Sequence, residues 1–305
     1  MLEVSLFGVF QVRDDSGQPV ALEGLRAREL LSFLLLHPGQ PHSREVLASA
    51  LWGGEAGTGP AAQSTAQSLK GLRQALWHLH LALPPDLHAG LLHLGGDRVE
   101  LRPHPDLSCD VTTFEGTVRD LQGRAGPDLN AAEARALREA VGLYRADLLE
   151  GWMADWCLTE RERLHSLHLA ALEKLTDHAE GCRDWEGGLR YAARLLAFDP
   201  ASEDTHRQVM RLHFRSGHRT AALRQFARCE RALREELGVR PSRATLALYE
   251  CIRDDRPLET VGEPPVPRPH GLAPDPALEL LQELRAAVRE LRALLAEGRR
   301  MRGER

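Results

Sequence analysis

The sequence has no apolar run that approaches the roughly 20 residues needed to cross a bilayer. Its first ten residues, MLEVSLFGVF, carry neither the basic start nor the cleavage site of a secretory signal peptide. The five cysteines are odd in number and include no C-x-x-C spacing, which is typical of a reduced compartment rather than of a disulfide framework. We therefore expect a cytoplasmic protein without a membrane partner.

The motifs of nucleotide-binding and hydrolytic enzymes are also absent. Neither the phosphate-binding pattern G-x-x-x-x-G-K-[ST] nor the nucleophile pattern G-x-S-x-G occurs. Among the fourteen histidines, His165 and His168 are spaced to share a helical face, but there is no H-E-x-x-H motif and no Cys/His quartet. We therefore predict no enzyme, no cofactor and no metal site.

Positive charge is scarce as well. Lys70 and Lys174 are the two lysines of the sequence, and the formal net charge is -5 at pH 7. Residues 1–104 contain eight Arg and Lys against ten Asp and Glu. The chain as a whole does not attract nucleic acid, so any affinity for DNA has to come from the placement of individual side chains.

The stretch from Ala61 to Leu83 predicts a helix with two faces when it is read at about 100° per residue. The apolar face consists of Ala62, Ala66, Leu69, Leu72 and Leu76. The opposite face consists of Gln63, Gln67, Lys70 and Gln74, flanked by Ser64 and Gly71.

This polar face suits a polyanion, because no Asp or Glu occurs between Glu55 and Asp86 to repel one. Glutamine side chains can read adenine, and lysine can read guanine or contact phosphate. Taken alone, the stretch also fits an ordinary amphipathic helix whose polar side faces solvent.

The segments around this helix have the order of a winged helix-turn-helix. A strand-like stretch, Leu2 to Val12, and a turn at 14–17 precede a helix over 25–36, which is followed by an N-cap at Ser43 and a second helix, Arg44 to Leu51. After the third helix, two short strands within 91–101 form the wing around a Gly-Gly-Asp-Arg turn. Residues expected inside are Leu30, Leu31, Phe33, Leu34 and Leu35 of the first helix and Val46, Leu47 and Leu51 of the second.

In this arrangement the third helix enters the major groove and the wing touches the DNA backbone. We predict a DNA-binding domain over residues 1–104. The side chains expected to contact bases are Gln63, Ser64, Gln67, Lys70 and Gln74. Those expected to contact phosphates are Arg73, Arg98 and Arg44.

Beyond a rigid joint at Pro103-His104-Pro105, strand signals stop and helical patterns fill residues 105–253. They cover residues 112–121, 131–144, 157–181, 185–198, 202–216, 219–237 and 242–253. The segment that begins at Trp185 is repeated 34 residues later from Arg219, with Ala193 aligned to Ala227. A 34-residue period of paired helices is typical of tetratricopeptide repeats, which bind peptides on a concave face or stack as a core. We expect Trp152, Trp156 and Trp185 in the core of this domain.

Residues 254–276 hold seven of the eighteen prolines and are predicted to be an extended linker. In the tail, residues 277–305, five apolar residues recur at steps of three and four: Leu281, Leu284, Val288, Leu291 and Leu295. This pattern predicts a short coiled-coil helix for weak dimerisation, or an amphipathic helix that docks on another domain. The predicted fold is thus mainly α, with a winged helix-turn-helix and small β-sheet first, a tetratricopeptide-like domain second and a helical tail.

Short motifs run along residues 2–253 in a characteristic order. They are Leu6-Phe7-Gly8, Arg28-Glu29-Leu30-Leu31, Ser43-Arg44-Glu45-Val46-Leu47, Ala50-Leu51-Trp52-Gly53, Leu72-Arg73 with Leu76, Asp110-Val111 with Phe114, Tyr144, Glu162-Arg163-Leu164, Ser216-Gly217-His218 and Leu237-Gly238-Val239-Arg240-Pro241-Ser242. Their order and spacing resemble those of the SARP-type bacterial transcriptional activators, which join an OmpR-like winged helix to a bacterial transcriptional activator domain of tetratricopeptide type.

The resemblance implies a nucleoid-associated transcriptional activator that binds promoter DNA at repeated half-sites, with the helical domain mediating homodimerisation or contact with RNA polymerase. Two positions depart from the family pattern. Lys70-Gly71 stands where the family usually has additional basic residues, and Gly96-Asp97 stands where its wing commonly has Gly-Tyr. Asp97 beside a phosphate is unfavourable unless Arg98 makes the contact.

These observations predict a sequence-specific DNA-binding transcriptional regulator. The alternative is a tetratricopeptide-type scaffold whose winged helix docks protein, which the net negative charge of residues 1–104 favours. Salt dependence separates the two, because phosphate contacts make affinity fall steeply with salt.

Overall fold

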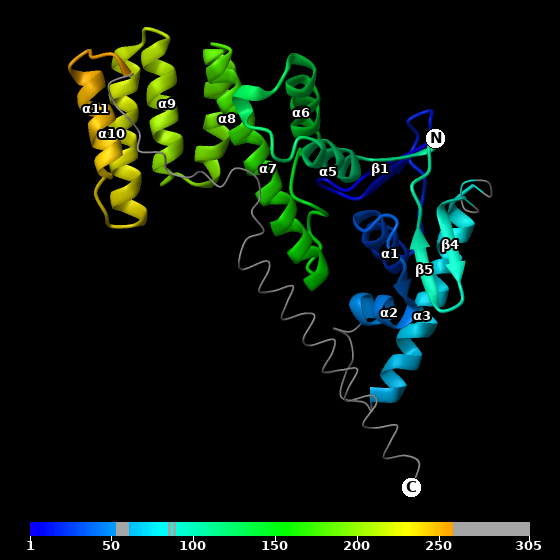
Figure 1. Cartoon of the computed structure of the whole chain (residues 1–305). Coiled ribbons are helices and arrows are strands. Elements are labelled where there is room, and N and C mark those ends of the chain that lie inside the picture. The colour runs from blue at the N-terminus through cyan, green and yellow to red at the C-terminus, as the bar shows by residue number, and fades with distance from the viewer. Residues whose placement is uncertain (53–60, 85–86, 88–89, 259–305) are drawn as a thin grey trace.

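The computed structural model shows a mainly helical chain with two small β-sheets near its start (Figure 1). It describes residues 1–52, 61–84, 87 and 90–258, and for residues 61–65 it describes the backbone without the side chains. The greater part of the predicted linker, from residue 259, and the predicted helical tail lie outside the described residues. Within them, no helix is both long and apolar enough to cross a membrane.

The first sheet joins the start of the chain to a segment about a hundred residues later. Strand β1 (Leu2–Ser5) pairs antiparallel with β2 (Gln11–Arg13) and parallel with β6 (Leu107–Cys109). The predicted continuous strand from Leu2 to Val12 is wrong, because the chain reverses at Gly8, whose φ is +90°. The expectation that strands end at residue 105 is also wrong, since β6 lies beyond it.

The second sheet and three helices form the predicted winged helix-turn-helix. Its elements are α1 (Leu25–Leu36), β3 (His42–Ser43), α2 (Arg44–Trp52), α3 (Ala61–Ala82), β4 (Leu92–Gly95) and β5 (Arg98–Leu101). The strand order is β3-β5-β4, with the wing hairpin β4–β5 antiparallel and Ser43 opposite Arg98.

Burial in the first two helices agrees with the apolar pattern except at one position. The five residues predicted inside α1 are buried, as are Leu47 and Leu51 in α2. Ser43 accepts a hydrogen bond from the backbone N–H of Val46 (3.2 Å), which is the predicted cap. Val46 itself is 54% exposed, so its predicted burial is wrong: Leu47, Ala48 and Leu51 already fill the inward side of this short helix.

The second half of the chain is a series of helices. They are α5 (Asp110–Asp120), the 3₁₀ turn η2 (Gly126–Asp128), α6 (Ala131–Leu143), α7 (Asp155–Gly181), α8 (Trp185–Phe198), α9 (Glu203–Arg215), α10 (Arg219–Glu236) and α11 (Arg243–Arg253). Successive helices from α7 to α11 pack on one another, and Figure 1 shows α8 to α11 following one another away from the winged helix.

The 34-residue repeat has a structural reason. Gly188 in α8 and Ala222 in α10 are equivalent positions, and both are buried. A Cβ on Gly188 would lie 3.0 Å from the Leu212 side chain, so a small residue is needed where α9 crosses α8. The aligned pair Ala193 and Ala227 is exposed and does not make this contact.

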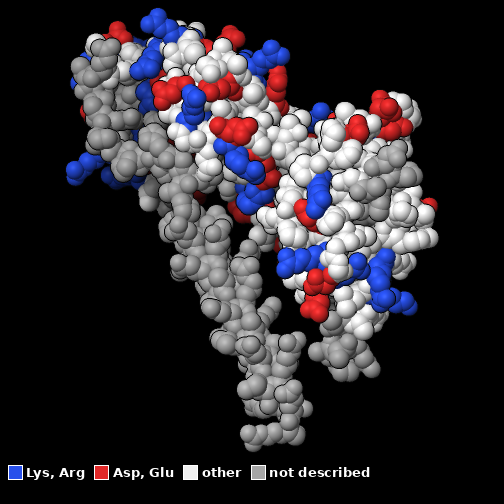
Figure 2. Space-filling view, turned by 45° about the vertical axis from the view of Figure 1, so that its right-hand side comes forward, with Lys and Arg blue, Asp and Glu red and all other residues white. Residues whose placement is uncertain are grey.

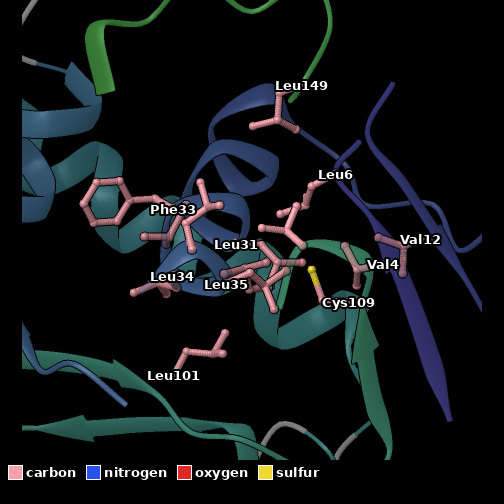
Figure 3. Packing of buried hydrophobic residues seen from close by; sticks show 14 of the residues in the cluster. Val4, Leu6, Val12, Leu31, Phe33, Leu34, Leu35, Leu101, Cys109 and Leu149 are labelled. Atoms are coloured by element: carbon pink, nitrogen blue, oxygen red, sulfur yellow. The ribbon is translucent and has the colours of Figure 1, made fainter. Parts of the chain in front are cut away.

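A continuous hydrophobic core joins the winged helix to the helices that follow it (Figure 3). Leu149, from the loop after α6, is fully buried among core residues of the first domain, including Leu6 and Leu31. The Trp156 ring of α7 meets the Phe33 ring of α1 edge-on, with centroids 5.6 Å apart. The division at residue 104 stays a prediction, and the core runs across it.

The three tryptophans predicted for the core of the helical domain are all half-buried. Trp152 and Trp156 lie at the junction with the N-terminal region rather than inside the helical repeats, and the Trp152 ring stacks on Phe10 at 6.1 Å. Hydrogen bonds also join the start of α5 to the segment after β1. The Asp110 carboxylate accepts them from the backbone N–H groups of Leu6 (2.9 Å) and Phe7 (3.1 Å).

Candidate nucleic-acid interface

Helix α3 is held by its C-terminal half. Leu72, Leu76 and Leu79 are buried against the core of the winged helix, each with less than a tenth of its surface exposed. Ala66, which the apolar pattern placed inside, is exposed, and Leu69 is half-buried. The predicted apolar face is therefore wrong at Ala66. Helices α1 and α2 contact α3 nearer its C-terminal end, and the N-terminal half of α3 projects past α1 and α2.

The exposed side of α3 carries polar side chains that are available to a ligand. Gln67, Lys70 and Gln74 are exposed, and within the described part of the chain they make no side-chain hydrogen bond or ion pair. Arg73 is exposed as well, and its Nε donates a long hydrogen bond to the Leu69 carbonyl (3.4 Å).

The backbone of α3 includes the other two predicted base-contacting residues, Gln63 and Ser64, but their side chains lie outside the described part. The residues named as contacts on α3 thus occupy one helix, as predicted, while their role in binding stays a prediction.

The wing brings together the two remaining predicted phosphate contacts. The backbone N–H of Arg44, at the start of α2, donates to the Asp97 carbonyl in the wing turn (2.8 Å). Arg98 is exposed and follows Asp97 directly, after a turn that places Gly96 at φ +58°. Arg44 is half-buried, and its Nε is buried without a hydrogen-bond partner in the described chain.

Charge is distributed unevenly over this region. In Figure 2, Lys and Arg gather toward the lower end of the lobe formed by the winged helix, with acidic side chains among them, and further Asp and Glu lie at its upper end. In Figure 1 the wing turn between β4 and β5 points toward the end of this lobe where α2 and the N-terminal half of α3 lie. The acidic formal charge of residues 1–104 is therefore compatible with one basic end.

Residues that the sequence pattern did not single out fix α3 to α2. Trp52, the last residue of α2, lies against Gly71 so closely that a Cβ there would be 2.7 Å from the indole Nε1. The Arg26 guanidinium lies 5.6 Å from the Trp52 ring centroid and donates to the Leu51 carbonyl (2.5 Å). Arg26 also pairs with Glu29 (2.7 Å).

The histidine pair considered for metal binding is engaged otherwise. His168 is buried and stacks on Tyr144 with ring centroids 4.1 Å apart, and its Nε2 accepts a hydrogen bond from Arg194 (2.9 Å). Burial, and then the Arg194 charge, lower the pKa of His168 to about 4. Burial and the hydrogen bond to Asp147 raise the pKa of Tyr144. Among the described residues, no group of three or more His, Cys, Asp or Glu side chains is arranged to hold a metal ion.

Comparison with known proteins agrees with this architecture. Residues 109–253 match the bacterial transcriptional activator domain. The chain is 28% identical over 228 residues to the regulatory protein AfsR of Streptomyces coelicolor, covering 74% of this chain and 22% of AfsR. It is 27% identical over 275 residues to the regulatory protein DnrI of Streptomyces peucetius, covering 87% of this chain and 97% of DnrI.

The fold also has a counterpart among solved structures. EmbR of Mycobacterium tuberculosis, determined in complex with a low affinity phosphopeptide, superposes with a TM-score of 0.63 at 22% identity, covering 85% of this chain and 67% of EmbR. The chain spans only about a fifth of AfsR, so it corresponds to one part of that larger regulator. The order of an N-terminal winged helix and a match to the bacterial transcriptional activator domain over residues 109–253, together with these regulatory relatives, makes the chain similar to the SARP-type bacterial transcriptional activators.

Proposed function

We propose that this protein is a transcription regulator that binds promoter DNA with α3 in the major groove. The observation that carries the proposal is the combination on one helix of a buried face, at Leu72, Leu76 and Leu79, and of exposed Gln67, Lys70 and Gln74, which have no side-chain partner among the described residues. A helix anchored at one half and projecting at the other can enter a groove without disturbing the core that holds it.

Arg73, Arg98 and Arg44 are proposed to contact phosphates on either side of the groove. Arg44 and Arg98 lie next to the same wing turn, so they can contact neighbouring phosphates once α3 is in place. Exposed Arg98 beside Asp97 can offset the repulsion between that carboxylate and the DNA.

The helical domain is proposed to mediate homodimerisation on repeated half-sites or contact with RNA polymerase. This part of the proposal rests on the resemblance to the SARP-type activators, with support from relatives named as regulatory proteins and from the match to an activator domain. Sedimentation of the protein with a duplex carrying one or two half-sites would test it. Two protein molecules are expected on the duplex with two half-sites. A single protein molecule on each of the two duplexes would contradict homodimerisation.

The DNA itself is best found by pulling down genomic fragments with the purified protein at two salt concentrations and sequencing them. Fragments that share a short repeat spaced by about one helical turn would support the proposal. The Gln67→Ala, Lys70→Ala double variant should lose about 1–3 kcal/mol of binding free energy for each base contact removed. Exposed Arg190→Ala on α8 is the matched control. Wild-type affinity in the double variant would contradict the assignment of α3.

The second candidate function is a winged helix that docks protein rather than DNA. Its support is apolar exposure on the same helix: Trp77 is 57% exposed and Leu81 is 62% exposed. Absence of enriched DNA fragments at low salt would favour this candidate, and the variants to test next would then be Trp77→Ala and Leu81→Ala.

A further inference from the structure

We propose that Gly71 and Trp52 act as positioning residues that set where α3 lies, and hence which bases it meets. The inference rests on the proposed function, because it concerns the same helix. It explains a departure from the family pattern: position 71 holds glycine because the Trp52 indole occupies the space that any side chain would need.

Three atoms of the Trp52 indole lie where a side chain at position 71 would begin. A Cβ on Gly71 would lie 2.7 Å from Nε1, 2.9 Å from Cε2 and 3.2 Å from Cζ2 of Trp52. Distances below about 3 Å between such atoms lie deep in the repulsive range, so either the indole or the helix has to move.

The indole is not free to move away. Trp52 packs against the hydrophobic core, and the Arg26 guanidinium lies 5.6 Å from its ring centroid. Arg26 is held in turn by the Leu51 carbonyl at 2.5 Å and by Glu29 at 2.7 Å. Helices α1, α2 and α3 are thus braced through one arginine, one tryptophan and one glycine.

The brace acts close to the residues proposed to read DNA. Gln67 lies four residues before Gly71 and Gln74 lies three after it, so both are its neighbours on the helix surface. Lys70 directly precedes Gly71. A side chain at position 71 would push α3 away from α2 at this point and displace all three polar side chains together, whereas the buried Leu76 and Leu79 hold the helix farther along.

Gly71→Ala separates positioning from stability, because alanine is a better helix former than glycine. The matched control is Gly116→Ala in α5, where an added Cβ meets nothing within 4 Å. Two duplexes of equal length serve as probes: the sequence enriched by the wild-type protein, and a scrambled version. Gly71→Ala is expected to bind the enriched duplex about tenfold more weakly, roughly the loss of one base contact, with little change on the scrambled duplex. Gly116→Ala is expected to bind both as wild type does.

Trp52→Phe provides the rescue. Phenylalanine is smaller than tryptophan and still offers a ring to Arg26, so the double variant Trp52→Phe, Gly71→Ala should recover most of the lost affinity. Failure of the rescue, or equal weakening on both duplexes, would overturn the positioning role. If wild type and Gly71→Ala bind the enriched duplex equally, only this inference fails. If wild type does not discriminate between the duplexes, the proposed function fails and this inference fails with it.

Discussion

Replacing His168 with glutamine should remove a defined part of the acid sensitivity of the fold. His168 is 1% exposed, and burial and Arg194 lower its pKa from 6.5 to about 4 in the folded chain. As the pH falls below 6.5, the unfolded chain takes up a proton at this position and the folded chain does not. The contribution of His168 to the free energy of unfolding is therefore fully present above pH 6.5 and is lost as the pH falls toward 4.

The size of the effect follows from the pKa difference. Each pKa unit corresponds to about 1.4 kcal/mol, so the folding stability lost through protonation of His168 in the unfolded chain reaches about 2 kcal/mol by pH 5. The amide of the introduced glutamine would keep an oxygen acceptor for Arg194 but would not titrate. The replacement costs some stability at pH 7, because it removes the ring that stacks on Tyr144. The informative quantity is therefore the change in the free energy of unfolding between pH 7 and pH 5, and not its value at either pH.

Urea unfolding followed by circular dichroism at pH 7 and pH 5 measures this difference. The wild-type decrease also includes His42, His206 and His213, whose pKa values are lowered mainly by burial, so only the comparison with His168→Gln isolates His168. His93→Gln makes the same chemical change at an exposed position and should follow the wild-type pH dependence. An equal decrease in wild type and His168→Gln would refute the reasoning.

Three further outcomes follow from the described contacts. Arg98→Ala should reduce the slope of log affinity against log salt by about 1, and an unchanged slope would remove Arg98 as a phosphate contact. Phe33→Ala should cost about 3–5 kcal/mol, because Phe33 contacts Trp156 across the junction. It should keep one unfolding transition, because other core residues such as Leu149 still join the two regions; two separate transitions by calorimetry would contradict the shared core. Asn130→Ala should cost about 1 kcal/mol of stability and leave DNA affinity unchanged, since Asn130 only caps α6; a loss of binding would be inconsistent with that role.

The helices were predictable to within a few residues because their signals are local. The apolar spacing of α1, the cap at Ser43 and the glycine and proline stops depend on neighbours within one or two turns. Burial was predicted less well at the surface of each helix. Val46 and Ala66 have apolar side chains at plausible inward positions, but the partners that would cover them are absent from the described surface, and periodicity carries no information about partners.

The candidate site could likewise be predicted from the sequence only in part. The polar face of α3 could be found from the spacing of Gln67, Lys70 and Gln74, since residues three and four apart share a helix face. The fit of Trp52 on Gly71 could not be found, because it depends on how two helices cross after a loop. Likewise, Arg44 and Arg98 are 54 residues apart, and only the pairing of β3 with β5 brings them together.

The sequence by itself determined the order of elements, with the winged helix followed by helical repeats, and the polar face of α3. These depend on periodicity, caps and composition, which act over a few residues. Tertiary structure decided that β6 returns to pair with β1 and that Asp110 binds the backbone of Leu6. It also decided that Leu149 and Trp156 extend the core of the winged helix into the next domain. The physical reason is that strand pairing and core packing join residues about a hundred or more positions apart, whose meeting no local pattern records.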